Sequence, residues 1–392
     1  MQEQMALRLV SASSLPQELV RCVLGVIWSC SLSQNLDPRF YNIASHALQQ
    51  QGRALDARNR IRGRHGTGRR NQTGMELAGW AGRAGRAASA EAARGRFPSV
   101  VLDLPEKLLI LKPAGWEVYD DSTDAFQLRQ YLRHLFQFKV PILEDPDFNY
   151  GFLHRLDVPS SGLILAAKSF TAYYGLQAQL ASGRLLRHYL AVCHGLQCTR
   201  RIEAPLSWLE NAKLGGLSGS GLSLTRSGPG KPARTDFKLL RRAFSGPGSR
   251  GKMSALSRSS ETSARSAFKF LRPFFRSLSL GQIEIGTGRR HQIRSHLSHV
   301  GAPVLGDAKY TSQETFDDFD DFGEGDYEGD EGHCKTRTAL HRFRLCFQEE
   351  LGWRNVTALP DPGFEDFLGP FLDTGLSGPE RPSDLWDLLE PA

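Results

Sequence analysis

The sequence predicts a mixed α+β fold, because strand-like and helix-like segments follow one another through the middle of the chain. Apolar or alternating runs typical of strands occupy residues 100–111, 163–167, 185–194 and 281–286. Helical spacing of apolar residues appears at 128–136, 170–181 and 288–300. At 392 residues the chain is long enough for one sizeable core and for two or three domains.

Several of these elements make specific predictions about burial. The helix over 128–136 carries Leu128, Tyr131, Leu132, Leu135 and Phe136 on one face, so we expect this face in the core. The continuous apolar run 163–167 is typical of a buried strand. The helix over 288–300 is followed by Gly301, a residue that suits a helix C-terminus.

Composition excludes several classes of protein. The six cysteines form no CxxC pair, so we expect reduced thiols and neither a disulfide scaffold nor a zinc site. No apolar run reaches the length of a transmembrane helix, and we therefore expect no membrane partner.

The formal net charge of +7 conceals an uneven distribution. Residues 1–97 hold 14 Arg, no Lys and 6 acids, which gives +8. Residues 311–334 contribute −10 and residues 349–392 contribute −8. The remaining body has 33 basic and 16 acidic residues, a charge of +17 that would attract a polyanion.

Residues 1–96 are predicted to be a basic extension that is largely disordered. A helix is plausible over 15–30, but residues 51–95 are rich in Arg, Gly and Ala, a composition that buries little apolar surface. Three interpretations remain open: a mitochondrial or plastid transit peptide, an RNA-tethering arm, or an incorrect gene start. Without a transit peptide the expected location is the cytoplasm.

The predicted catalytic domain covers residues 97–348. It contains two Gly/Ser/Pro-rich insertions at 215–232 and 245–266 and an acidic insertion at 311–334. The acidic insertion lacks the ordered carboxylate spacing of a calcium loop, so we predict no metal site there. Residues 349–392 form an acidic tail to which we assign no chemistry.

The central motif is the run His154, Arg155, Leu156 and Asp157, followed by a Pro-Ser-Ser-Gly turn and the buried strand. A loop that is fixed by a buried strand can hold an acidic side chain rigidly at a surface cleft. The alternative is an exposed Arg–Asp pair, which contributes little to the stability of the fold. The residues of this motif alone leave both interpretations open.

Three motifs together resemble the RluA-type pseudouridine synthases. HRLD followed by SGL, an aliphatic run and AK resembles the catalytic motif of this family, and residues 108–118 (LLILKPAGWEV) resemble its early KPAG strand. Residues 286–310 (GTGRRHQIRSHLSHVGAPVLGDAKY) are similar to its GRTHQIR signature with the following HL, G-x-P and GD-x-x-Y. In addition, the run 340–347 (LHRFRLCF) resembles the closing strand of the family. The motifs occur in the order of the family over about 200 residues, which supports the resemblance.

The resemblance implies a fold and a reaction. The fold would be a mixed, mostly antiparallel sheet, split by a catalytic cleft and flanked by helices. The reaction would isomerise uridine to pseudouridine in rRNA or tRNA, without metal or cofactor, and we expect RNA as the partner of a monomer. The target base would have to leave its stack to reach the protein.

The resemblance also assigns roles to residues. Asp157 would be the catalytic carboxylate, Arg294 of HQIR would pair with it, and Tyr189 would pack on the uracil. Arg155 would fill the gap left by the flipped base. The further candidates for RNA contacts near the site are His154, Lys112, Lys168, Arg289, Arg290 and His291. Support of the cleft is the alternative for Lys112 and Lys168, and a structural role is the alternative for His291 and for His296. Whether Asp157 attacks covalently or acts as a base stays open.

Two departures from the family pattern concern the same motifs. Ser160 replaces a threonine but keeps the hydroxyl, whereas Arg290 replaces the threonine of GRTHQIR and adds a charge. The Arg290 substitution and the insertions leave room for a catalytically inactive RNA-binding protein. A hydrolytic glycosidase would need a second positioned carboxylate, and the motifs contain none.

Overall fold

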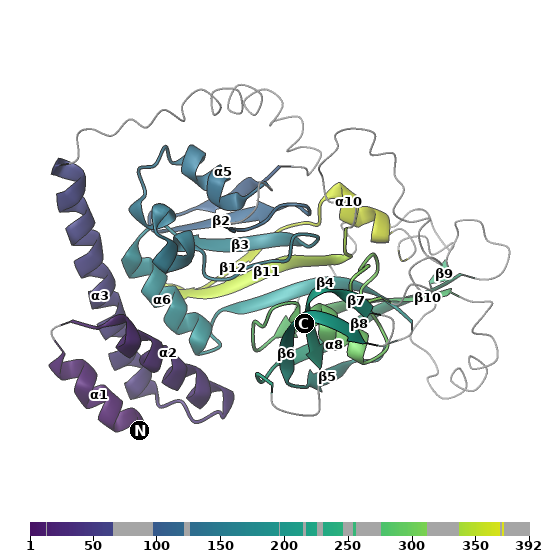
Figure 1. The fold of residues 1–392 in the computed structure, drawn as a ribbon, viewed down its shortest axis with the longest axis horizontal. Coiled ribbons are helices and arrows are strands. Elements are labelled where there is room, and N and C mark those ends of the chain that lie inside the picture. The colour runs from purple at the N-terminus through teal and green to yellow at the C-terminus, as the bar shows by residue number, and fades with distance from the viewer. Residues whose placement is uncertain are drawn as a thin grey trace. The chain divides into compact units, whose positions relative to one another are not determined.

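The computed structural model describes residues 1–12, 14–65, 97–120, 126–195, 197–214, 217–225, 230–245, 254–255, 276–311, 337–368 and 371. Their contacts divide the chain into two compact units (Figure 1). Unit 1 contains Met1–Leu186 and Arg344–Leu359, and unit 2 contains Arg187–Phe343 and Pro360–Ala392. Both units contain helices and strands, which confirms the predicted α+β class.

Unit 1 consists of an antiparallel sheet and a group of helices. Its strand order is β1-β2-β3-β11, with β12 paired to β11. The registers of β1–β2, β2–β3 and β11–β12 are all antiparallel. The strands are β1 (Ser99–Asp103), β2 (Lys107–Lys112), β3 (Ser161–Ala167), β11 (Leu340–Glu349) and β12 (Gly352–Thr357). The helices are α1 (Gln2–Ser11), α2 (Gln17–Leu32), α3 (Pro38–His65), α5 (Leu128–Leu135) and α6 (Phe170–Ala181), with 3-10 turns η1 (Pro141–Glu144) and η2 (Pro146–Gly151).

The core of unit 1 largely follows the predicted periodicity. All seven residues of β3 are buried, as expected for its apolar run, and α6 packs on β3. Helix α5 buries Leu128 and Leu132 completely, but Leu135 is 46% exposed. The prediction that Leu135 lies in the core is therefore wrong. Leu135 is the last residue of α5, so no further helical turn covers its side chain.

Unit 2 is built on a second group of antiparallel strands. Their order is β11-β4-β10-β8-β5, with β9 paired to β8, while β6 and β7 form a separate hairpin. Strand β11 passes from unit 2 to unit 1 after Phe343. The elements are β4 (Leu186–His194), β5 (Arg200–Glu203), β6 (Leu206–Leu214), β7 (Leu217–Thr225), β8 (Arg234–Ser245), β9 (Ser254–Ala255), β10 (Arg276–Ile285), α8 (Gln292–His299), α10 (Pro362–Glu365) and the 3-10 turn η4 (Asp366–Leu368).

Two segments predicted to be irregular contribute to unit 2. The predicted insertion 215–232 contains β7, whose Leu222 is fully buried against Tyr310. The acidic tail contains α10, and two phenylalanines of the tail, Phe364 and Phe371, are fully buried. Isolated apolar residues in these Gly- or acid-rich stretches supply the buried surface that average composition does not indicate. The acidic insertion 311–334 lies outside the described residues after Thr311, as does most of 245–266.

The N-terminal extension differs most from the prediction. Residues 2–65 are largely helical, and α2 and α3 pack on α6 in unit 1 (Figure 1). Phe40, Ala44 and Leu48 recur at every fourth position of α3 and are buried. The prediction of disorder is therefore wrong for residues 51–65, while residues 66–96 lie outside the described part of the chain. No helix within the described ranges has both the length and the apolar character needed to cross a bilayer.

Helix α3 reaches α6 by a close contact and a cap. A Cβ atom on Gly52 would lie 2.5 Å from the Cα atom of Thr171, so only glycine allows this approach. One turn later, the Asp56 carboxylate accepts hydrogen bonds from the N–H of Phe170 (3.0 Å) and from the N–H and hydroxyl of Thr171 (3.1 and 2.7 Å). The Ser169 hydroxyl accepts from the N–H of Ala172 (3.0 Å), so the first three N–H groups of α6 all have acceptors.

We expect Asp56→Ala to lower the free energy of unfolding by about 1–2 kcal/mol, the usual cost of losing a helix cap. Urea denaturation of the full chain, followed by circular dichroism, would measure the effect. Arg58→Ala is the matched control, because Arg58 is exposed on the same helix. Equal urea midpoints for both variants and wild type would contradict the docking of α3 on α6.

Candidate active site

The HRLD loop is fixed from inside unit 1 by a buried lysine. The Lys112 side chain is fully buried at the end of β2, where Lys112 pairs with Gly162 of β3. Its ammonium group donates hydrogen bonds to the carbonyls of Pro113 (2.9 Å), Trp116 (2.8 Å) and Val158 (3.3 Å). Lys112 therefore ties the KPAG turn to the residue that follows Asp157. Its predicted contact with RNA is wrong, because a fully buried ammonium group cannot reach a phosphate.

Asp157 lies half-buried at the end of this loop, as its position before a buried strand predicts. The backbone around it is held by the N–H of Ser160, which donates to the Asp157 carbonyl (3.1 Å), and by the N–H of Gly115, which donates to the Val158 carbonyl (2.8 Å). Ser160 and Ser161 are buried. A half-buried carboxylate on a fixed backbone can act on a bound substrate with little reorganisation.

The other predicted cations of unit 1 have carboxylate partners. Arg155 is 46% exposed, lies 2.6 Å from Glu117, and stands over the ring of Tyr119 at 4.8 Å. Lys168 lies 2.6 Å from Asp103 with its side chain 15% exposed. Arg155 has the exposure that an RNA contact needs, whereas Lys168 joins the end of β3 to Asp103 at the end of β1. His154 is partly buried in the same loop as Asp157.

In unit 2, Arg294 is held by a carboxylate that sequence reasoning missed. Its Nε and Nη2 donate to the two oxygens of Asp307 at 2.6 and 2.7 Å, a fork that leaves Nη1 out. The Arg294 and Asp307 side chains are 5% and 0% exposed. Asp307 also accepts from the N–H of Lys309 (3.1 Å) and of Tyr310 (3.3 Å). The fork therefore fixes the orientation of the guanidinium group and balances its charge.

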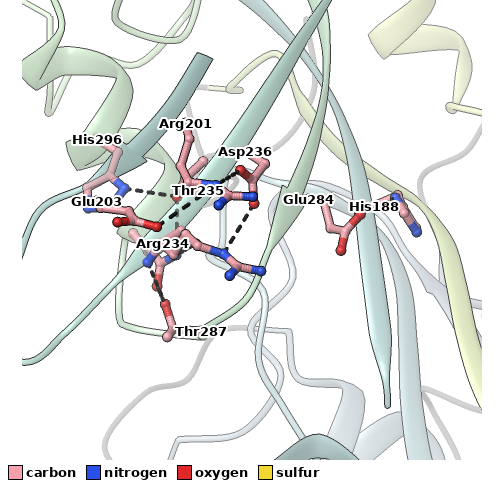
Figure 2. Close-up of polar contacts among 10 residues, drawn as sticks. His188, Arg201, Glu203, Arg234, Thr235, Asp236, Glu284, Thr287 and His296 are labelled. Atoms are coloured by element: carbon pink, nitrogen blue, oxygen red, sulfur yellow. Dashed lines mark hydrogen bonds and ion pairs between the residues drawn. The ribbon is translucent and has the colours of Figure 1, made fainter. Parts of the chain in front are cut away.

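Helix α8, which carries Arg294, is anchored on β8 by two other residues of its motif. His296 is within hydrogen-bond distance of the Thr235 hydroxyl (2.9 Å) and of the Ala204 carbonyl (3.0 Å), and burial lowers its pKa (Figure 2). Gln292 donates to the Arg234 carbonyl (2.8 Å). Figure 2 also shows the ion pairs of Asp236 with Arg201 and Arg234 near the same strand. His296 is thus a structural residue.

Tyr189 is held by a second arginine that sequence reasoning missed. The Arg342 Nη2 donates to the Tyr189 hydroxyl at 2.5 Å, and both side chains are buried. Arg187 is buried beside them, and its pKa falls to about 10 through burial, partly offset by Tyr189 and reinforced by Arg342. A Cβ atom on Gly288 would lie 2.6 Å from Arg187 Nη1, so this glycine of GTGRR makes room for the guanidinium group.

The predicted catalytic residues are divided between the units. Asp157 belongs to unit 1, while Tyr189 and Arg294 belong to unit 2. The pairing of Arg294 with Asp157 therefore stays a prediction. Asp307 lies in the quoted GD-x-x-Y motif and Arg342 in the run 340–347, so both were visible as charged residues in motif segments.

The three basic residues before α8 have different surroundings. Arg289 is partly exposed and its Nε donates to the Pro232 carbonyl (3.1 Å). Arg290 is exposed and lies over Trp208. His291 is in the left-handed region (φ 52°) and its Nδ1 is 2.9 Å from the Tyr310 hydroxyl. No group of three or more His, Cys, Asp or Glu residues within the described ranges could hold a metal ion.

Comparison with known proteins identifies relatives of the central segment. An uncharacterized RNA pseudouridine synthase of Bacillus subtilis, YlyB, is 30% identical over 169 residues, which are 43% of each chain. Ribosomal large subunit pseudouridine synthase D of Haemophilus ducreyi is 24% identical over 212 residues, 54% of this chain and 49% of the relative. In these two matches the chain spans about half the length of the relative.

Two further similarities cover more of the chain. Ribosomal large subunit pseudouridine synthase C of Buchnera aphidicola is 26% identical over 271 residues, 68% of each chain. Among solved structures, human RNA pseudouridylate synthase domain containing 1 is 21% identical with a TM-score of 0.44, covering 68% of this chain and 84% of that chain.

A family model described as RNA pseudouridylate synthase matches residues 107–299. This segment contains the fixed HRLD loop, Tyr189 and Arg294 in the order that the three motifs predict. The segment 107–299 is therefore identified as a segment of the RNA pseudouridylate synthase family.

Proposed function

We propose that this chain isomerises uridine in RNA to pseudouridine. The observation that carries the proposal is the HRLD loop, in which the carboxylate of Asp157 is half-buried on a backbone that Lys112 holds. The loop lies within the segment that matches the family model. The charge of +17 on the body of the chain supports RNA as the partner.

The reaction is balanced without any added reactant. The bond between N1 of uracil and C1′ of ribose breaks, the base turns, and a bond from C5 of uracil to C1′ replaces it. The proton that leaves C5 is compensated by the proton that N1 gains. Asp157 either attacks the nucleotide or removes a proton from the sugar, and both routes need its ionised form.

Tyr189 and Arg294 have supporting roles in the proposal. A lone half-buried carboxylate tends to take up a proton, and a fixed guanidinium group opposes this. The fork with Asp307 fixes the orientation of the Arg294 guanidinium group. Tyr189 is buried and its hydroxyl is held by Arg342, so in the proposal its ring packs on the uracil only after the base has entered the site.

The substrate class follows from the relatives. Two of them are named ribosomal large subunit pseudouridine synthases, which supports rRNA over tRNA for this chain. Mapping pseudouridines in cellular RNA with and without this protein tests the proposal directly. Loss of pseudouridines from rRNA would support the proposal. Loss of pseudouridines from tRNA alone would indicate tRNA as the substrate instead.

We expect Asp157→Asn to lower the rate of pseudouridine formation by at least about 100-fold, because the barrier depends on the carboxylate. RNA affinity should stay unchanged or tighten slightly, because the variant removes a negative charge. Tritium release from labelled RNA and salt-dependent RNA binding would measure the two effects. Asp147→Asn, an exposed carboxylate of the same unit, is the control.

A similar rate for Asp157→Asn and wild type would place the site elsewhere. If wild type bound RNA tightly and made no pseudouridine on any cellular RNA, the chain would be an inactive RNA-binding protein.

Variants of the Arg294–Asp307 pair can separate the effect of this pair on the stability of the chain from its effect on turnover. We expect Asp307→Leu to destabilise the chain by about 3–5 kcal/mol, because it leaves a buried guanidinium group without its carboxylate. The double variant Arg294→Met/Asp307→Leu should recover most of this loss, since an apolar pair of similar volume replaces the ion pair. Its turnover should nevertheless stay as low as that of Arg294→Met. Urea unfolding and product formation, measured on all three variants, test this; turnover near the wild-type rate in the double variant would exclude a role for Arg294.

A further inference from the structure

An open pocket of about 570 Å³ lies in unit 2, between the β6–β7 hairpin, the segment 230–231 and the turn before α8. Figure 1 shows β6, β7 and α8 in this part of the unit. Its walls come from two parts of the sequence, residues 206–231 and residues 288–290. The catalytic roles proposed above use none of its lining residues.

The chemistry of the pocket combines an aromatic face with a guanidinium group. Trp208 on β6 is 36% exposed, and the guanidinium carbon of Arg290 lies 3.9 Å from the centre of its ring. The His291 ring meets Trp208 edge-on, with centroids 5.6 Å apart. A guanidinium group stacked on an indole ring forms a flat, positively charged surface on which a nucleobase can stack.

Positive charge surrounds this face. Lys231 and Arg290 are exposed lining residues, and Arg289 is partly exposed beside them. Among the described residues that line the pocket, none is Asp or Glu. Within the described part of the chain, neither Lys231 nor Arg290 forms an ion pair with a carboxylate. The pocket is therefore suited to an anion that carries an aromatic ring.

The walls are joined by hydrogen bonds, so the pocket is formed before any ligand binds. The Ser223 hydroxyl donates to the Arg290 carbonyl (2.6 Å), and the Ser223 N–H donates to the hydroxyl of buried Tyr310 (2.8 Å). The Tyr310 hydroxyl also lies 2.9 Å from His291 Nδ1. Leu206 and Lys231 exchange two backbone hydrogen bonds of 3.0 and 2.9 Å. Preorganisation of this kind lowers the entropic cost of binding.

We propose that this pocket binds one nucleotide of a single-stranded stretch of the RNA substrate, with the base stacked on Trp208 and Arg290 and the phosphate against Lys231 and Arg289. The identity of the ligand as RNA rests on the proposed function. The pocket depends on Arg290, which stands where the family motif has threonine, so this contact is a property of this chain. Stacking tolerates every base, and the pocket therefore contributes affinity and placement with little sequence preference.

The experiment compares the binding of a short fluorescein-labelled single-stranded RNA to full-length variants by fluorescence anisotropy at several salt concentrations. Trp208→Leu should raise Kd about 5- to 150-fold, the range expected for one base–aromatic stack, without changing the salt dependence. Trp208→Phe should bind far better than Trp208→Leu, because it keeps an aromatic face. Lys231→Gln should reduce the slope of log K against log salt by about 0.7, as expected for one phosphate contact on a single strand.

Trp353→Leu is the matched control, because Trp353 is an exposed tryptophan on β12 of unit 1. If Trp208→Leu and Trp353→Leu bind RNA equally well, the pocket proposal is overturned whatever the activity. If poly-glutamate binds with the same dependence on Trp208 as RNA, the pocket recognises acidic peptides and the RNA assignment is overturned. Pseudouridine formation by wild type is measured in parallel: its absence, together with a Trp208-dependent Kd, would remove the proposed function and leave the RNA pocket supported.

Discussion

The buried ammonium group of Lys112 is the constraint on which the candidate site in unit 1 depends. Burying a cation is unfavourable unless its donors find acceptors, and here three backbone carbonyls accept them. One of these carbonyls belongs to Val158, the residue after Asp157. The KPAG turn and the HRLD loop are therefore joined through one side chain, and the backbone of Asp157 is tied to the register of β2 and β3.

Unit 2 applies a related constraint through two buried arginines. Arg294 is held by a carboxylate fork and Arg342 by the hydroxyl of Tyr189. A buried ion pair contributes little net stability, since desolvation offsets much of the attraction, but its geometry is strict. The contribution of the Asp307 fork is therefore to fix the orientation of the Arg294 guanidinium group. Each unit therefore orients a charged group of its own: the loop of unit 1 fixes the backbone of Asp157, and the fork of unit 2 fixes the guanidinium group of Arg294.

The N-terminal helices show how a few contacts can override composition. Average hydrophobicity indicates disorder for residues 51–65, and this part of α3 is indeed polar over much of its surface. Gly52 nevertheless allows the backbone of α3 to approach α6, and Asp56 supplies the acceptors that the first turn of α6 lacks. These two residues have no recognisable pattern in the sequence, because their function depends on a helix more than one hundred residues away.

The sequence alone determined the α+β class, the buried run of β3, the extent of α6, and the position of Asp157 at the end of a loop before a buried strand. These features depend on neighbours along the chain, where periodicity and turn residues act directly. Only the tertiary structure decided that Lys112 is buried, that Leu135 is exposed, and that Asp307 and Arg342 orient the predicted site residues. Arg294 and Asp307 are 13 residues apart and Arg342 and Tyr189 are 153 apart. The partner of a buried charge is set by which segments meet in the fold, and no local pattern encodes that meeting.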